Sequence, residues 1–153
     1  MRFMKMRKAF CCLVLFAGLA NADPFTGTWV LNLGKSKLPP PPPRSQTSYI
    51  DADSAGIRIR EVIVQENGEQ INVTVEAKFD GKDYPIAGSP FVDTVAYHRV
   101  DSYTLKGVVK KAGQVVTQET AVVSRDGRVL TGTYSGTDLS GKKVDAVAVF
   151  DKQ

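Results

Sequence analysis

The stretch QINVTVEAKF, Gln70 to Phe79, decides the fold class because apolar and polar side chains alternate along it without a break. Its apolar positions are Ile71, Val73, Val75, Ala77 and Phe79. Successive side chains of an extended chain point to opposite faces. A period of two therefore predicts a β-strand with one face in a core and the other in solvent.

Similar runs fill the chain before and after this stretch, and residue pairs that end in glycine mark the turns between them. The pairs are Asn67-Gly68, Asp80-Gly81, Ala112-Gly113, Asp126-Gly127 and Ser140-Gly141. Such pairs favour tight connections between antiparallel strands. We predict strands at 27–33, 46–51, 57–66, 70–79, 94–100, 103–110, 115–124, 128–134 and 143–150, with 84–87 as a tenth if that segment also pairs. The alternation is less regular over 57–64, where we expect a β-bulge near Arg60 and Glu61 to switch its face.

The short turns predict an all-β, antiparallel up-and-down meander of about nine to ten strands. An open sheet of that size would leave two unpaired edges, which closure into a barrel removes. One segment has a different composition: Leu38 to Arg44 contains the five prolines Pro39 to Pro43, which exclude an α-helix. We interpret 38–44 as a stiff strap that joins the first strand to the second.

The first 22 residues have the pattern of a secretory signal peptide. Met1 to Lys8 carries four basic residues and no acid, an apolar run follows from Ala9 to Leu19, and Ala20 and Ala22 supply small residues for cleavage. The apolar run is too short to span a bilayer. We therefore expect an exported protein, periplasmic or extracellular, with a single domain over 23–153.

Removal of the leader changes the charge and the cysteine content. Four of the 20 lysines and arginines lie in the leader and all 16 acids lie after it, so basic and acidic residues balance from Asp23 onward. Without a basic cluster we expect no nucleic-acid partner. Cys11 and Cys12, the only cysteines, lie in the leader, and the residues before them do not form a lipidation motif. The mature protein is expected to be soluble and monomeric, without a disulfide or membrane anchor.

Gly27-Thr28-Trp29, at the start of the first strand, resembles the Gly-x-Trp motif of the lipocalin and fatty-acid-binding barrels. The surrounding sequence and the stretch Asp80 to Pro85 (DGKDYP) are similar to exported bacterial lipocalin-like proteins. The resemblance implies a lipocalin-like barrel in which Trp29 plugs one end and packs under a basic residue from a late strand, here Arg128 or Lys143. The chain departs from the fatty-acid-binding branch, because it lacks that branch's helical pair after the first strand and its Arg-x-Tyr on the last.

Tyr97 and Arg99 are the candidate ligand-binding residues. They stand two positions apart on one predicted strand and share a face. If that face is interior, a guanidinium and a phenol could hold a carboxylate or phosphate. The alternative is that both point outward and Arg99 pairs with a neighbouring acid.

No catalytic residue, cofactor or metal site is predicted. His98 is the only histidine, and we interpret it as an ordinary strand residue. Asp51 to Gly56 begins like a calcium loop but has Val62 where such a loop needs a glutamate, so we predict a polar turn. The sequence favours a non-catalytic barrel that binds a small apolar or amphipathic ligand. A structural or protein-interaction module with a filled core is the alternative, and an enzyme is the third class.

Overall fold

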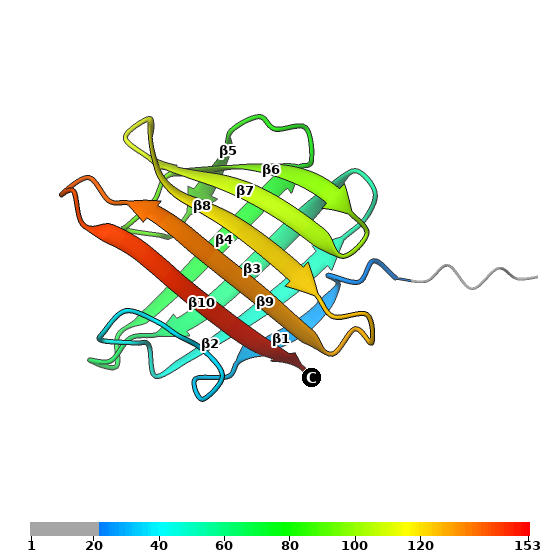
Figure 1. Ribbon diagram of the computed structural model, residues 1–153, viewed down its shortest axis with the longest axis horizontal. Coiled ribbons are helices and arrows are strands. Elements are labelled where there is room, and N and C mark those ends of the chain that lie inside the picture. Colours follow the sequence, from blue (N-terminus) through cyan, green and yellow to red (C-terminus); the bar gives the residue numbers. More distant parts are fainter. Residues whose placement is uncertain (1–21) are drawn as a thin grey trace, which may run out of the picture.

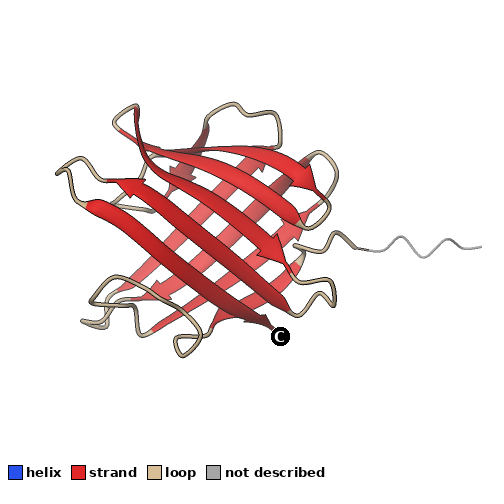
Figure 2. Ribbon diagram, viewed as in Figure 1, coloured by secondary structure: helices blue, strands red, loops and turns tan. Residues whose placement is uncertain are grey.

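A computed structural model describes residues 22–153, so the predicted leader lies outside the described residues except for Ala22. The described chain folds into ten antiparallel strands without a helix (Figure 1, Figure 2). The strands are β1 (Gly27–Leu31), β2 (Ser45–Ala52), β3 (Gly56–Val64), β4 (Gln70–Lys78), β5 (Tyr84–Ala87), β6 (Thr94–Asp101), β7 (Thr104–Lys111), β8 (Gln114–Val123), β9 (Val129–Thr137) and β10 (Lys143–Lys152). The predicted fold class is confirmed, and 84–87 is the tenth strand.

The strands form one closed barrel in which each pairs with its sequence neighbours and β1 pairs with β10. The closing register sets Trp29 opposite Lys152 and Leu31 opposite Phe150. This architecture is consistent with a lipocalin-like barrel. We call the end that holds Phe25 and Trp29 the floor end, and the opposite end, where the segment 32–44 runs, the strap end.

The expected bulge near Arg60 and Glu61 is wrong. The pairing of β3 with both neighbours is continuous through these residues, for example Arg60 with Tyr49 and Glu61 with Val73. The register shifts instead lie between Arg99 and Asp101 and between Val109 and Lys110. The alternation in β3 is irregular because Glu61 is a carboxylate on the inward face.

The floor end is tightly packed around Trp29. Its side chain is fully buried, and its indole N–H donates to the Phe25 carbonyl oxygen at 2.8 Å. Phe25 is 1% exposed. The basic residue over the indole is Lys152, whose ammonium lies 4.9 Å from the ring centroid. The choice between Arg128 and Lys143 is therefore wrong, because the barrel register brings the end of β10, and neither of those residues, to β1.

The packing of the floor end explains why residue 27 is a glycine. Its φ of +148° is one that L side chains rarely adopt, and a Cβ atom there would collide with the Lys152 side chain. Glycine at this position lets Lys152 cross β1 and reach the indole.

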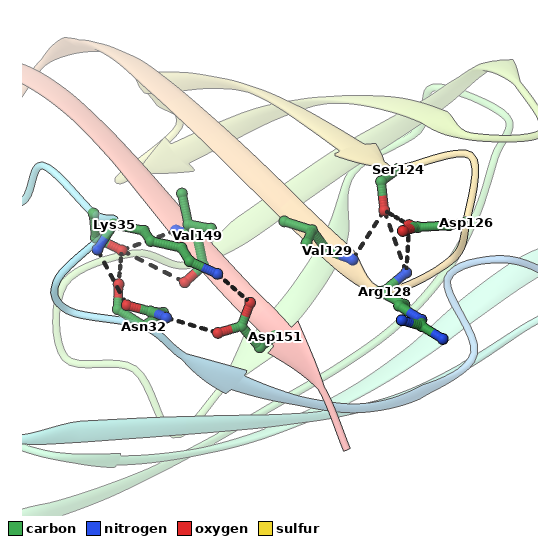
Figure 3. Close-up of polar contacts among 9 residues, drawn as sticks. Asn32, Lys35, Ser124, Asp126, Arg128, Val129, Val149 and Asp151 are labelled. Atoms are coloured by element: carbon green, nitrogen blue, oxygen red, sulfur yellow. Dashed lines mark hydrogen bonds and ion pairs between the residues drawn. The ribbon is translucent and has the colours of Figure 1, made fainter.

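Side-chain hydrogen bonds tie the segment after β1 to β10, as the left-hand group in Figure 3 shows. The Asn32 amide donates to Asp151 at 2.7 Å and Lys35 forms a 3.0 Å ion pair with the same carboxylate. The Val149 amide donates to the Ser36 hydroxyl at 2.9 Å. These contacts hold the start of the strap against the last strand.

Replacement of Trp29 by alanine is expected to lower the free energy of unfolding by about 3 to 5 kcal/mol, because it removes a fully buried aromatic side chain and leaves a cavity. Denaturant titration measures the loss. Phe91→Ala is the matched control, since Phe91 is 68% exposed and its removal should change stability by less than about 0.5 kcal/mol. A Trp29→Ala loss below about 1 kcal/mol would contradict the packed floor.

Candidate functional site: a polar belt inside the barrel

Six polar side chains on inward-facing positions form a belt around the barrel wall. We call them the polar belt: Gln46, Ser48, Glu61, Tyr97, Glu119 and Tyr134. The positions next to them along each strand on the same face are largely apolar. The belt therefore interrupts an otherwise hydrophobic interior.

The strand register explains why these residues meet. On one wall, Ser48 of β2 stands opposite Glu61 of β3. On the other wall, Tyr97 of β6 pairs with Gly107, Gly107 with Glu119 of β8, and Glu119 with Tyr134 of β9. Since β3 and β8 are five strands apart in a ring of ten, the two glutamates come from opposite sides of the barrel.

Two inward-facing glycines make room for the larger belt side chains. A Cβ atom on Gly107 would stand 2.5 Å from Glu119 Oε1, so the carboxylate lies across this glycine. A Cβ atom on Gly132 would stand 2.7 Å from the Tyr134 hydroxyl oxygen, so that ring lies across the second glycine. The Glu119 and Tyr134 side chains therefore lie along the inner surface of the barrel instead of pointing straight to its axis.

Glu61 is held by two neighbours on β2. The Ser48 hydroxyl donates to Glu61 Oε1 at 3.1 Å and the Gln46 amide donates to the same oxygen at 3.2 Å. Burial nevertheless raises the pKa of the Glu61 carboxyl, against the opposing effect of these two hydrogen bonds. The protonated form is thereby favoured more than in water.

The pKa of the Glu119 carboxyl is also raised, and here the shift is large. Burial raises its pKa to about 7, Tyr97 opposes the shift by donating a hydrogen bond, and the negative charge of Glu61 adds to it. The carboxyl therefore exchanges its proton near neutral pH.

The two phenols face the same carboxylates. Burial, followed by the negative charge of Glu119 and Glu61, raises the pKa of Tyr97 well above its usual value and raises that of Tyr134 in the same way. Both hydroxyls therefore stay protonated at neutral pH and can donate hydrogen bonds to an anion or accept them from a donor.

The predicted pair Tyr97 and Arg99 is divided by the structure. Tyr97 belongs to the belt, whereas the Arg99 guanidinium lies nearer the floor end, 2.8 Å from Asp23 and 4.4 Å from the Phe79 ring centroid. The Asp23 contact is an ion pair of poor hydrogen-bond geometry, because Arg99 Nη2 and Nε have no hydrogen-bond partner within residues 22–153. Arg99 is thus occupied by an acid of its own chain, and none of the belt residues is basic.

The interior is packed unevenly along the barrel axis. Around the floor, Trp29, Phe25 and Val123 are 0%, 1% and 1% exposed. At the belt, Glu61, Glu119 and Tyr134 keep some accessible surface although they face inward. The same holds for Ala146, which pairs with Tyr134 on β10. The belt level is therefore less completely filled than the floor.

The outer surface has grooves, but their polar groups contact one another. One groove, of about 670 Å³, is lined by residues of β1 to β5. There Arg58 forms a 2.6 Å ion pair with Asp51, and the Arg60 guanidinium lies 3.9 Å from the Tyr49 ring centroid. Arg58 is thus paired with an acid, and Arg60 with an aromatic ring, of the neighbouring strand.

The remaining sequence candidates lie outside the belt. His98 is exposed on β6. The turn between β2 and β3 is a polar turn, since Asp53 accepts hydrogen bonds from the backbone amides of Ala55 and Gly56 at 2.7 and 3.0 Å. Within residues 22–153 no group of three or more His, Cys, Asp or Glu side chains is arranged to hold a metal ion. The same part of the chain contains no helix that is long and apolar enough to cross a membrane.

No protein-family model matches the chain, and a search of curated proteins finds no match either.

Sequence reasoning found Tyr97 but missed the two glutamates. Glu61 stands between Ile59 and Ile63 on the apolar parity of β3, a signal that was interpreted as a bulge. Glu119 shares its parity with Thr117 and Ala121, which are too small and polar to mark an inward face. For Glu61, a glutamate among isoleucines of the same parity was the sequence feature that could have identified a buried acid.

The raised pKa of Glu119 predicts a pH dependence of stability. The folded protein binds this proton more tightly than the unfolded chain does, so stability is expected to fall as pH rises from 4.5 toward 7 and to stay lower above it. Glu119→Gln should flatten this dependence, making the variant more stable than wild type at pH 8 by up to about 3 kcal/mol.

Denaturant titrations at pH 5 and pH 8 measure this difference. Glu76→Gln is the matched control, because Glu76 is exposed on the outward face of β4. Parallel pH profiles for wild type and Glu119→Gln would contradict a protonatable, buried Glu119.

Proposed function

We propose that the protein is an exported, non-catalytic binding protein that holds one small amphipathic molecule inside its barrel. The polar belt anchors the polar group of the ligand, and inward apolar side chains contact the rest. The observation that carries this proposal is a group of inward polar side chains, including two carboxyls with raised pKa values, at a level that is less completely filled than the floor. Polar groups on the inner face of a barrel are costly to take out of water, so their retention at a level that is not fully packed favours a role in recognition.

The residues on either side of the belt suit the apolar part of such a ligand. Ile59 and Ile63 flank Glu61, and Ala146 is a small side chain beside Tyr134. Binding sites for small molecules commonly combine apolar walls with a few fixed polar groups. The floor closes one end, so the ligand is expected to enter from the strap end.

Arg99 is not included in the proposed site. Its guanidinium already pairs with Asp23, and a ligand carboxylate would have to displace that acid. Tyr97 remains a proposed ligand contact through its place beside Glu119.

Binding of N-phenyl-1-naphthylamine, a neutral probe whose fluorescence rises in apolar surroundings, tests the proposal. Wild-type protein is expected to bind it. Ala146→Phe fills the interior at belt level and should weaken binding at least about tenfold, which corresponds to the loss of about 1.4 kcal/mol. Fluorescence titration gives both affinities.

Ser135→Phe is the matched control, because Ser135 is exposed on the outward face of β9 next to Tyr134. It should bind the probe as wild type does, and circular dichroism checks that both variants fold. Failure of wild type to bind, or equal binding by both variants, would favour the alternative of an interaction module with a filled core.

Export is supported by the leader pattern, in which a basic segment and an apolar run precede the small residues Ala20 and Ala22. We expect cleavage after Ala22, so that the mature chain begins at Asp23, whose carboxylate accepts the Phe25 amide at 3.0 Å. Intact-mass analysis of the protein from cell envelope and medium measures the first residue. A start more than a few residues away, or an added lipid mass, would contradict the predicted processing.

A further inference from the structure

No basic side chain of the polar belt balances the negative charge of its two carboxyls. Glu61 and Glu119 face the interior from opposite walls, and no belt residue is basic. Arg99 stands two positions from Tyr97 but faces Asp23. Buried carboxylates are costly unless a counter-charge or hydrogen bonds compensate them.

The carboxyls also keep unused hydrogen-bonding capacity. Both bonds to Glu61 end on Oε1, from Ser48 and Gln46. Glu119 has Tyr97 as its hydrogen-bonding neighbour. An ionised carboxylate has about four acceptor sites and an ammonium group has three donors, so these groups complement each other.

The phenols add a second, independent feature. Tyr97 is only 8% exposed, so its hydroxyl lies in the interior with Glu119 as its polar neighbour. Tyr134 stands opposite Glu119 on β8, and its hydroxyl lies within reach of the charges of Glu119 and Glu61, which together with burial raise its pKa. Phenol oxygens accept hydrogen bonds from N–H groups, and aromatic rings attract cations.

We propose, on the basis of the function proposed above, that the polar group of the ligand is the ammonium of an organic amine. This cation lies between Glu61 and Glu119, with the Tyr97 and Tyr134 hydroxyls beside it. The apolar part of the amine then lies along the inward apolar side chains. An anionic ligand would meet two acids and no base at this level. A neutral alcohol would gain hydrogen bonds but no charge pairing.

Protonation of the belt gives the proposal a pH dependence. The groups that face Glu119 are Tyr134 from β9, Tyr97 from β6 and Glu61 from β3, whereas Gly107 of β7 and Ala146 of β10 are uncharged. Both tyrosines stay neutral near pH 7, so the glutamates are the groups that change charge. Amine binding should therefore tighten as pH rises toward 8, because the carboxyls ionise.

The test is displacement of N-phenyl-1-naphthylamine by three molecules of equal chain length: decylamine, decanol and decanoate. At pH 7 decylamine is expected to displace the probe at concentrations about 10- to 100-fold lower than decanol does, the effect of a charge-assisted contact. Decanoate should be the weakest. Between pH 5.5 and pH 8 the decylamine affinity should rise while the decanol affinity stays constant.

Glu119→Gln should remove most of the preference for decylamine over decanol. Glu61→Gln provides a second variant if the first does not fold, and Glu76→Gln on the outer face should behave as wild type. Equal displacement by decylamine and decanol would overturn the cation while leaving ligand binding intact. Preferred displacement by decanoate would overturn the cationic ligand and indicate an anionic one. A wild-type protein that does not bind the probe would overturn both proposals.

Discussion

Pairing of β1 with β10 is the constraint on which the rest of the structure depends. Three residue pairs, from Trp29 with Lys152 to Leu31 with Phe150, turn a ten-stranded meander into a barrel. Closure removes both free edges and gives every strand one enclosed face. Any polar side chain on that face must then find a partner inside the barrel, and Glu61 and Glu119 are in this position because of closure alone.

The fold was predictable because it follows from local patterns. The alternation in Gln70 to Phe79 and the glycine turns suffice to predict an antiparallel meander, and the strand at 84–87 agrees with them. Contacts between distant strands were not predictable in the same way. Lys152 was missed as the partner of Trp29 because only the closing register brings the end of the chain to β1. Parity placed Tyr97 and Arg99 on one face but left open whether that face is inward, and the acid that pairs with Arg99, Asp23, lies far away in the sequence.

The interior of the barrel has a tightly packed apolar level and a polar level. At the floor, buried side chains such as Phe25 and Trp29 pack without accessible surface, which supplies apolar stabilisation. At the belt, Glu61 and Glu119 are partly buried, which raises their pKa values, and only some of their acceptor sites have hydrogen-bond partners. The packed floor offsets the cost of polar groups at the belt that a uniformly packed core would exclude. Gly107 and Gly132 contribute to the polar level, because the absence of a Cβ atom leaves space for the Glu119 and Tyr134 side chains.

Both ends of the described chain lie at the floor end (Figure 1). The Asp23 carboxylate pairs with Arg99, and the Gln153 amide donates to the Thr28 carbonyl oxygen at 3.0 Å. A linker of a few residues would join these ends without crossing the barrel, so the protein is suited to circular permutation, with new termini in the turn at Ala112-Gly113. For the same reason, attachment to a surface through either end of the described chain leaves the strap end facing solution.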